Sequence, residues 1–263
     1  MSLILKSPDL KVFEGGSQEI SVDAISFNGT SSYIQYTNNF FRDTDLRYTE
    51  VGNAFTLSFW IKPASSLANN SVFRIIDVRD GSTNQVYEVL IKTNASGSRQ
   101  IEVKYEDDNS NFLQAKSGFG PSLLTLGSWN HVIYSVEQLG ATDDGDHRMY
   151  VNDSLIVNAT IGGNFDAGDI TATPTASTNT AIGKLQSAGS GYYDGCLSEV
   201  WMKDVFYDFD VESNRRKFIS DNSKPVELPA SPRVYLKGTA STWTNTGSTD
   251  LGTQTLNNIT DCA

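Results

Sequence analysis

The densest run of carboxylates that could bind a cation is TDDGDH, which contains Asp143, Asp144 and Asp146. Clustered carboxylate oxygens are the ligands that calcium prefers in proteins. The same composition is typical of a solvated hairpin turn, because Asp and Gly relieve the strain of a tight turn. The hairpin is the favoured interpretation, and the sequence leaves the metal content open.

Cysteine and histidine, which build most nucleophilic and zinc sites, are scarce. The chain contains two cysteines, Cys196 and Cys262, and two histidines, His131 and His147. Two thiolates cannot complete an all-cysteine zinc site, which needs about four. No Gly-x-Ser-x-Gly turn or similar strained turn surrounds a serine or cysteine. The sequence therefore predicts that the protein is not an enzyme.

These four residues also have structural interpretations. His131 lies in an expected strand, where a hydrogen-bonded histidine is favoured over a general base. His147 lies beside a turn, and we expect its side chain to be exposed. Cys196 and Cys262 either form one bridge that ties down the C-terminus or remain independent thiols, one buried and one in the tail.

The charge of the chain excludes several partner classes. Of its 263 residues, 31 are acidic and 20 are basic, giving a formal net charge of −11. This charge repels a nucleic acid backbone and offers little to an anionic membrane. The start, MSLILKSPDLKV, has too short an apolar run for a secretory signal, and no later run approaches a membrane span. We expect a soluble chain, so that any export needs another route.

Apolar and polar residues alternate in many short segments, which predicts strands. In AFTLSFWIKP, one face carries Phe55, Leu57, Phe59 and Ile61, and the other carries Thr56, Ser58, Trp60 and Lys62. We expect a half-buried strand here that ends at Pro63. Turn residues predict hairpins at IKTNASGSRQIEV, EQLGATDDGDHRMYV and YVNDSLIV, the last through Asn152 and Asp153. About ten such strands predict an all-β fold, an antiparallel two-sheet jelly-roll sandwich.

One short helix is expected after the last core strand, in DVESNRRKFIS. Asp210 would cap it, and its spaced residues are Val211, Arg215, Phe218 and Ile219. We assign residues 1–20 to an N-terminal arm or edge strand and residues 21–220 to the sandwich. Residues 221–263 are assigned to a linker and C-terminal attachment tail, because the prolines of SDNSKPVELPASP favour extended backbone.

The order of six motifs resembles that of the laminin G-like and pentraxin-like group of concanavalin A-like domains. The motifs are AISFNGTSSYIQY, FTLSFWIKP, GSWNHVIYSV, RMYVNDSLI, TAIGK and GYYDGCLSEVWMKDVFYDFDVESNRRKF. The resemblance covers about residues 24–220, and it implies a sandwich with Leu197, Val200 and Met202 in the core. Strict alternation cannot bury both Leu197 and Val200, so we expect an irregularity between them.

The resemblance also implies sites, and several of its positions are altered here. Related glucanases carry E-x-D-x-x-E on one strand, whereas this chain has Glu106 and Asp108 followed by Asn111. Asn28 and Asn152 replace aspartates of the group, and TNTAIGKLQSAGSG lacks the acidic cluster of its calcium-binding members. Calcium is therefore not supported at the family positions.

Glycan binding needs exposed aromatic rings that stack on sugars. Tyr192 and Tyr193 flank the rim loop of the family, and Trp60 and Trp201 alternate away from the predicted core. These four residues are the candidate glycan site. An equally supported alternative is that they pack under a loop or against a neighbouring subunit.

The C-terminal SPRVYLKGTASTWTNTGSTDLG loosely resembles the ends of concanavalin A-like proteins of marine and cyanobacterial bacteriophages. This resemblance implies a non-enzymatic virion protein, oligomeric in its assembly, with glycan adhesion as an additional role. Its arm and tail would dock on other virion proteins. The alternatives are a secreted, extracellular lectin or adhesin module of a cellular organism, and a decoration protein that binds no sugar.

Overall fold

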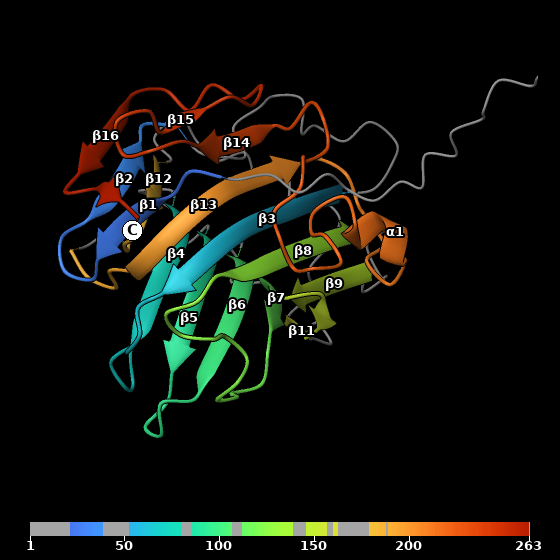
Figure 1. Ribbon diagram of the computed structural model, residues 1–263, viewed down its shortest axis with the longest axis horizontal. Coiled ribbons are helices and arrows are strands. Elements are labelled where there is room, and N and C mark those ends of the chain that lie inside the picture. The colour runs from blue at the N-terminus through green and yellow to red at the C-terminus, as the bar shows by residue number, and fades with distance from the viewer. Residues whose placement is uncertain are drawn as a thin grey trace, which may run out of the picture.

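The computed structural model describes residues 22–38, 53–79, 86–106, 112–138, 146–156, 160–162, 179–187 and 189–262. In these ranges, seventeen strands form two antiparallel sheets that pack face to face (Figure 1). The predicted all-β sandwich is confirmed. The predicted arm, residues 1–20, lies outside the described residues.

The larger sheet has nine strands. Its order is β10-β9-β8-β3-β13-β1-β17, and β14 pairs with both β13 and β15. The strands are β1 (Ile25–Asn28), β3 (Asn53–Pro63), β8 (Asn130–Gln138), β9 (Asp146–Val151), β10 (Ser154–Leu155), β13 (Asp194–Lys203), β14 (Val234–Lys237), β15 (Thr244–Asn245) and β17 (Thr260–Asp261).

The second sheet has eight strands in the order β11-β7-β6-β5-β4-β12-β2-β16. The strands are β2 (Tyr33–Tyr36), β4 (Val72–Arg79), β5 (Val86–Thr93), β6 (Arg99–Glu106), β7 (Phe112–Lys116), β11 (Thr160–Gly162), β12 (Asn179–Ile182) and β16 (Gln254–Asn257). The predicted hairpin between β5 and β6 is confirmed, with Asn94 accepting hydrogen bonds from the turn.

The inner faces of the two sheets form one continuous apolar core. The β3 residues Phe55, Leu57, Phe59 and Ile61 belong to it, as expected. Ile76, Val89 and Val103 face them from three neighbouring strands of the second sheet. Burial of this apolar surface is the main force that holds the sheets together.

The outer face of β3 differs from the expectation of a half-buried strand. Thr56, Ser58 and Trp60 are at most 4% exposed. The Thr56 hydroxyl donates to the Val205 carbonyl (2.7 Å), so the chain that follows β13 lies over this face. A second apolar cluster forms there from Ile133, Tyr150, Trp201, Phe209 and Phe218. Both faces of β3 are therefore covered.

The irregularity predicted in the last core strand is confirmed. The pairing of β13 with β3 shifts register between Ser198 and Trp201, and Glu199 has a φ of 52°. The bulge places both Leu197 and Val200 in the core. The Asn152–Asp153 turn is confirmed as well, since both residues have positive φ between paired β9 and β10.

The structure contradicts a separate C-terminal tail. Strand β14 pairs with β13, β16 pairs with β2, and β17 pairs with β1, so residues 221–263 supply strands to both sheets. Trp243 and Leu251 are buried in the main core, and Cys262 is bonded to Cys196 in β13. The boundary predicted at residue 221 therefore does not divide the fold.

The predicted helix is shorter than expected, and its cap is wrong. The helix α1 spans Glu212–Arg215, and its N-cap residue is Val211, which makes no side-chain cap. The Asp210 carboxylate accepts hydrogen bonds from the Tyr150 hydroxyl (2.8 Å) and from Arg148 Nε (2.7 Å) instead. No helix in the described ranges has the length and apolar character that a membrane crossing requires.

Candidate functional site

Three of the four predicted glycan-binding rings are buried. The Trp201 indole donates to the Pro229 carbonyl (3.0 Å), and its ring meets the Phe218 ring edge-on. Trp60 packs against the His131 ring at 4.7 Å between centroids, and Tyr193 donates its hydroxyl to the Cys196 carbonyl (3.1 Å). A ring with no open face cannot stack on a sugar, so burial contradicts this role for the three residues. The alternative, packing under a loop, holds for Trp201.

Tyr192 is the fourth predicted ring, and it is partly exposed. It lies in the loop 183–193, which joins β12 to β13. The neighbouring Gly191 carbonyl accepts a hydrogen bond from the Arg74 backbone N–H (2.9 Å). This bond places the loop, and with it Tyr192, beside β4 in the eight-stranded sheet.

The outer face of that sheet carries a row of polar side chains. Because paired residues of antiparallel strands share a face, the register aligns Asp77, Glu88, Lys104 and Gln114 across β4 to β7. Glu102 and Lys116 are likewise paired. We call this surface the polar face. It comprises Arg74, Asp77, Arg79, Glu88, Lys92, Glu102, Lys104, Gln114 and Lys116, with Lys184 and Gln186 of the loop at its border.

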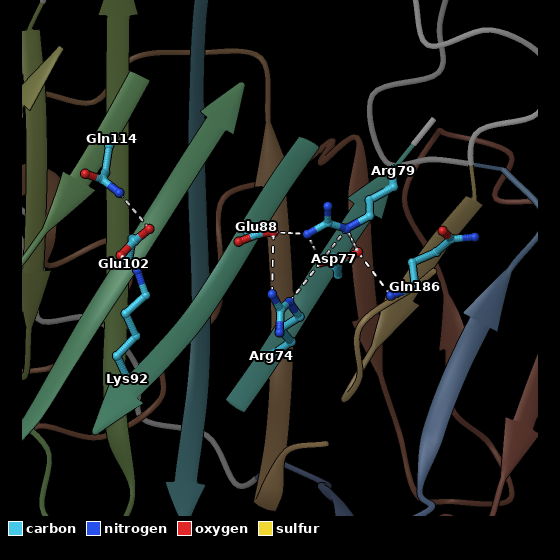
Figure 2. A network of polar contacts seen from close by, with 8 residues as sticks. All are labelled: Arg74, Asp77, Arg79, Glu88, Lys92, Glu102, Gln114 and Gln186. Atoms are coloured by element: carbon cyan, nitrogen blue, oxygen red, sulfur yellow. Dashed lines mark hydrogen bonds and ion pairs between the residues drawn. The ribbon is translucent and has the colours of Figure 1, made fainter. Parts of the chain in front are cut away.

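One arginine joins two carboxylates at the centre of the polar face (Figure 2). Arg79 donates from Nε to Asp77 Oδ1 (2.9 Å) and from Nη2 to both Asp77 Oδ2 (3.2 Å) and Glu88 Oε1. Arg74 approaches from the other side, with Nε 3.3 Å from Asp77 Oδ2. The Gln186 backbone N–H completes the shell of Asp77 (3.1 Å to Oδ1).

A second carboxylate site lies on β6, the strand next to the one that carries Glu88. Glu102 accepts hydrogen bonds from the Lys92 ammonium (2.6 Å) and the Gln114 amide (2.7 Å), and all three side chains meet above β5, β6 and β7 (Figure 2). The Glu102 side chain is only 2% exposed, whereas that of Lys92 is 34% exposed. The carboxylate thus lies beneath its partners and fixes their positions.

Burial raises the pKa of Glu88, while the charges of Arg79 and Arg74 oppose the shift. Asp77 and Glu88 are cross-strand neighbours, as paired catalytic carboxylates of glycosidases could be. Here one guanidinium holds both, so neither is free to deliver a proton to a leaving group. The arrangement suits the binding of polar groups better than acid–base catalysis.

The candidate cation ligands are not assembled in the described part of the chain. Asp143, Asp144 and the side chain of Asp146 lie outside the described residues. The same holds for the positions compared with the glucanase motif, which are the side chain of Glu106, Asp108 and Asn111. Among the described residues, no three His, Cys, Asp or Glu side chains form a group that could hold a metal ion. Asn28 instead caps a loop, since its Oδ1 accepts hydrogen bonds from the backbone N–H groups of Thr30, Ser31 and Ser32.

Both histidines are buried. His131 Nε2 lies 2.9 Å from the Ser58 hydroxyl, and burial lowers the pKa of His131 to about 3, although Asp153 opposes the shift. The expectation of a hydrogen-bonded strand histidine is therefore confirmed. His147 is 8% exposed and bonds to the Tyr134 hydroxyl (3.0 Å), so the prediction that it is exposed was wrong. Its strand β9 turns it toward Tyr134 of the neighbouring β8.

Sequence reasoning missed the polar face although it found the strands. The signal was present as Asp77 and Arg79 in VFRIIDVR and as Glu88 in VYEVLIKT, at alternating positions. The sequence does not give the register that brings them together. Two exposed aromatic residues, Phe119 (48%) and Trp129 (39%), were also missed as candidate binding residues.

Comparison with known proteins agrees with the fold. The sequence profile of the concanavalin A-like lectin/glucanases superfamily matches residues 28–205. Among solved structures, a Bacteroides ovatus protein described as a candidate carbohydrate-binding protein has a TM-score of 0.52 and 16% identity, over 92% of this chain and 60% of its own. Tailspike protein 2 of an Escherichia coli O157:H7 bacteriophage has a TM-score of 0.50 and 13% identity, over 86% of this chain.

The chain spans only 31% of the length of that tailspike protein, so the similarity concerns one part of it. At these identities the solved structures show a shared fold. No curated protein matches the sequence.

Proposed function

Because the chain belongs to the concanavalin A-like lectin/glucanase superfamily, we propose that it is a non-catalytic glycan-binding module and that its polar face holds the glycan. The observation that carries the proposal is the array of amide, guanidinium and ammonium donors fixed on one sheet by buried carboxylates. Sugar hydroxyls bind through such converging polar groups.

The rigidity of the polar face supports this role. Asp77, Glu88 and Glu102 hold Arg79, Lys92 and Gln114 in place before any ligand arrives. Groups that are already ordered lose little conformational entropy on binding. Tyr192 lies in the bordering loop, where a partly exposed ring could stack on a sugar at the edge of the face.

We further propose that the module belongs to a bacteriophage particle and adheres to the host surface. The C-terminal resemblance to phage proteins supports this placement, and a phage tailspike shares the fold. The Cys196–Cys262 bridge suits a protein that works outside a reducing cytosol. A secreted lectin would meet the same conditions and is the alternative. Mass spectrometry of purified phage particles would distinguish the two roles. Many copies of this chain per particle would support the phage protein, and its absence from the particles would support the secreted lectin.

The glycan-binding proposal is tested with a panel of immobilised neutral and acidic polysaccharides. We expect the wild-type protein to be retained by at least one of them. The double variant Tyr192→Ala and Gln186→Ala, in the bordering loop, should lose retention without a change in melting temperature. Leu155→Ala, at an exposed site on the other sheet (55% exposed), is the matched control and should bind as the wild type does. Retention of the loop variant at the wild-type level would reject this surface.

A further inference from the structure

The polar face carries two separate groups of ordered side chains. The arginine group comprises Arg74, Asp77, Arg79 and Glu88, and the glutamine group comprises Lys92, Glu102 and Gln114. Among the residues drawn in Figure 2, no hydrogen bond or ion pair joins the two groups. Each contains a carboxylate side chain that is at most 2% exposed, Asp77 in one and Glu102 in the other. The face therefore offers two binding points, each held by its own carboxylate.

Both groups keep polar atoms that a sugar hydroxyl can bond. Arg79 uses Nε and Nη2 for the carboxylates of its group, and within the described part of the chain its Nη1 has no hydrogen-bond partner. The Gln114 amide nitrogen donates to Glu102, and its Oε1 accepts no hydrogen bond from a described residue. Lys92 also donates to Glu102, and its side chain is 34% exposed. A hydroxyl both donates and accepts, so either group can hold one.

The width of the polar face sets the length of a glycan that contacts its whole row of polar groups. One row of paired residues crosses β4 to β7 on this face, namely Asp77, Glu88, Lys104 and Gln114. Strands β4 and β7 are three strand spacings apart, which is about 14 Å. A single pyranose does not reach across this distance, whereas two or three linked sugars do.

The loop that joins β12 to β13 extends this row on the β4 side. Gln186 donates its backbone N–H to Asp77 Oδ1 (3.1 Å), and the Arg74 backbone N–H donates to the Gly191 carbonyl (2.9 Å). These bonds fix the loop, with its partly exposed Tyr192, next to the arginine group. The loop, the arginine group and the glutamine group therefore follow one another across the sheet.

We infer that the polar face binds a chain of linked sugars along its length, with consecutive sugars at the loop, the arginine group and the glutamine group. This inference rests on the proposed function and names the ligand class, which is an oligosaccharide or the interior of a polysaccharide rather than one terminal sugar. Once one sugar is bound, its linked neighbour meets the next group at a high effective concentration. Affinity therefore rises with chain length until the chain spans the row.

Isothermal titration calorimetry of the full chain tests the inference. The probes are monosaccharides to hexasaccharides derived from xylan, pullulan, polygalacturonate and chondroitin sulfate. Arg79→Lys keeps a positive charge and removes the planar fork of the guanidinium. Gln114→Ala removes the amide and leaves Lys92 bonded to Glu102. Lys224→Gln, at an exposed site in the segment that covers the other sheet, is the control.

We expect one oligosaccharide to bind per protein chain, and its affinity to rise at least about tenfold from the monosaccharide to the trisaccharide. Arg79→Lys and Gln114→Ala should each lower the affinity for the trisaccharide about tenfold, as the loss of a hydrogen bond to an ordered polar group would. The control should bind as the wild type does. Losses that multiply in the double variant would show that one ligand contacts both groups.

Other outcomes separate this inference from the proposed function. A monosaccharide that binds as tightly as the trisaccharide would overturn the inference and leave glycan binding standing. A loss confined to one variant, or absent from both, would do the same. Two trisaccharides per chain, one lost with each substitution, would show two unconnected sites and would also overturn it. No binding of any of these sugars would overturn the inference, and no retention by any polysaccharide would overturn both proposals.

Discussion

Cys196 in β13 is bonded to Cys262, 66 residues later in the chain, with their Cα atoms 5.9 Å apart. Ser26 of β1 pairs with Cys196 on one side and with Thr260 of β17 on the other. The bridge therefore links the end of β17 to β13 across the intervening strand β1. A cross-link over such a long loop stabilises the fold mainly by restricting the unfolded chain.

Loss of this bridge should lower the free energy of unfolding. We expect Cys262→Ser to reduce it by about 2–4 kcal/mol in urea unfolding under non-reducing conditions. With a reductant present, the wild-type and variant midpoints should converge. Equal midpoints without reductant would show that the bridge contributes nothing to stability.

The C-terminal segment should be needed for folding. Deletion of residues 221–263 removes β14, β16 and β17 and exposes core around the sites of Trp243 and Leu251. We expect the truncated protein to lack the near-ultraviolet circular dichroism of a packed core and to be digested rapidly by protease. A stable, cooperatively unfolding fragment would restore the independent tail that the sequence alone suggests.

The failure of the tail prediction has a physical cause. Segment 233–262 is polar and rich in turn residues, and its strands are two to four residues long. Such strands carry too few alternating positions to be recognised, and two of them, β16 and β17, pair with strands more than 200 residues distant in the sequence. By contrast, β3 and β13 are long enough for the alternation of apolar and polar residues to be recognised. The bulge at Glu199 could be predicted because strict alternation cannot bury both Leu197 and Val200.

The polar face could not be predicted from the sequence for a similar reason, since it also depends on strand pairing. Alternation predicts that Asp77 and Glu88 point away from the core, but their contact depends on the pairing of β4 with β5. The burial of Trp201 depends on where residues 205–229 fold back. Neither arrangement is encoded within one strand, so the candidate site had to come from the structure.

Truncation of the aromatic residues that cover the outer face of the larger sheet should lower the free energy of unfolding. Trp201 and Phe218 are fully buried against each other on the outer face of the larger sheet. We expect Phe218→Ala to reduce the free energy of unfolding by about 3–5 kcal/mol, because it leaves a cavity in a packed cluster. Tyr192→Ala, at a partly exposed ring, should change it by about 0.5 kcal/mol or less. Similar midpoints for the two variants in chemical unfolding would contradict the assigned burial.

His131 should make stability depend on pH. Its pKa falls from 6.5 to about 3 on folding because burial disfavours the charged ring. The unfolded chain therefore binds the extra proton first, so stability is fully present above pH 6.5 and declines as the pH falls toward 3. Protonation of His131 lowers the free energy of unfolding by at most about 1.4 kcal/mol per pH unit.

The variant His131→Gln isolates that contribution. It should be less stable than the wild type at pH 7, but its unfolding free energy should fall less steeply between pH 6.5 and 4.5. Urea midpoints at several pH values would measure both slopes. Identical slopes would mean that His131 is not held neutral by the fold.

The polar face as the ligand surface is tested most directly by amide chemical shifts. An oligosaccharide of a polysaccharide that retains the protein is titrated into isotopically labelled protein. We expect shifts concentrated in β4 to β7 and in residues 184–192, with Arg79, Lys92 and Gln114 at the centre. Shifts concentrated at the exposed rings of Phe119 and Trp129, or over residues 205–229, would contradict it and place the binding site elsewhere on the sandwich.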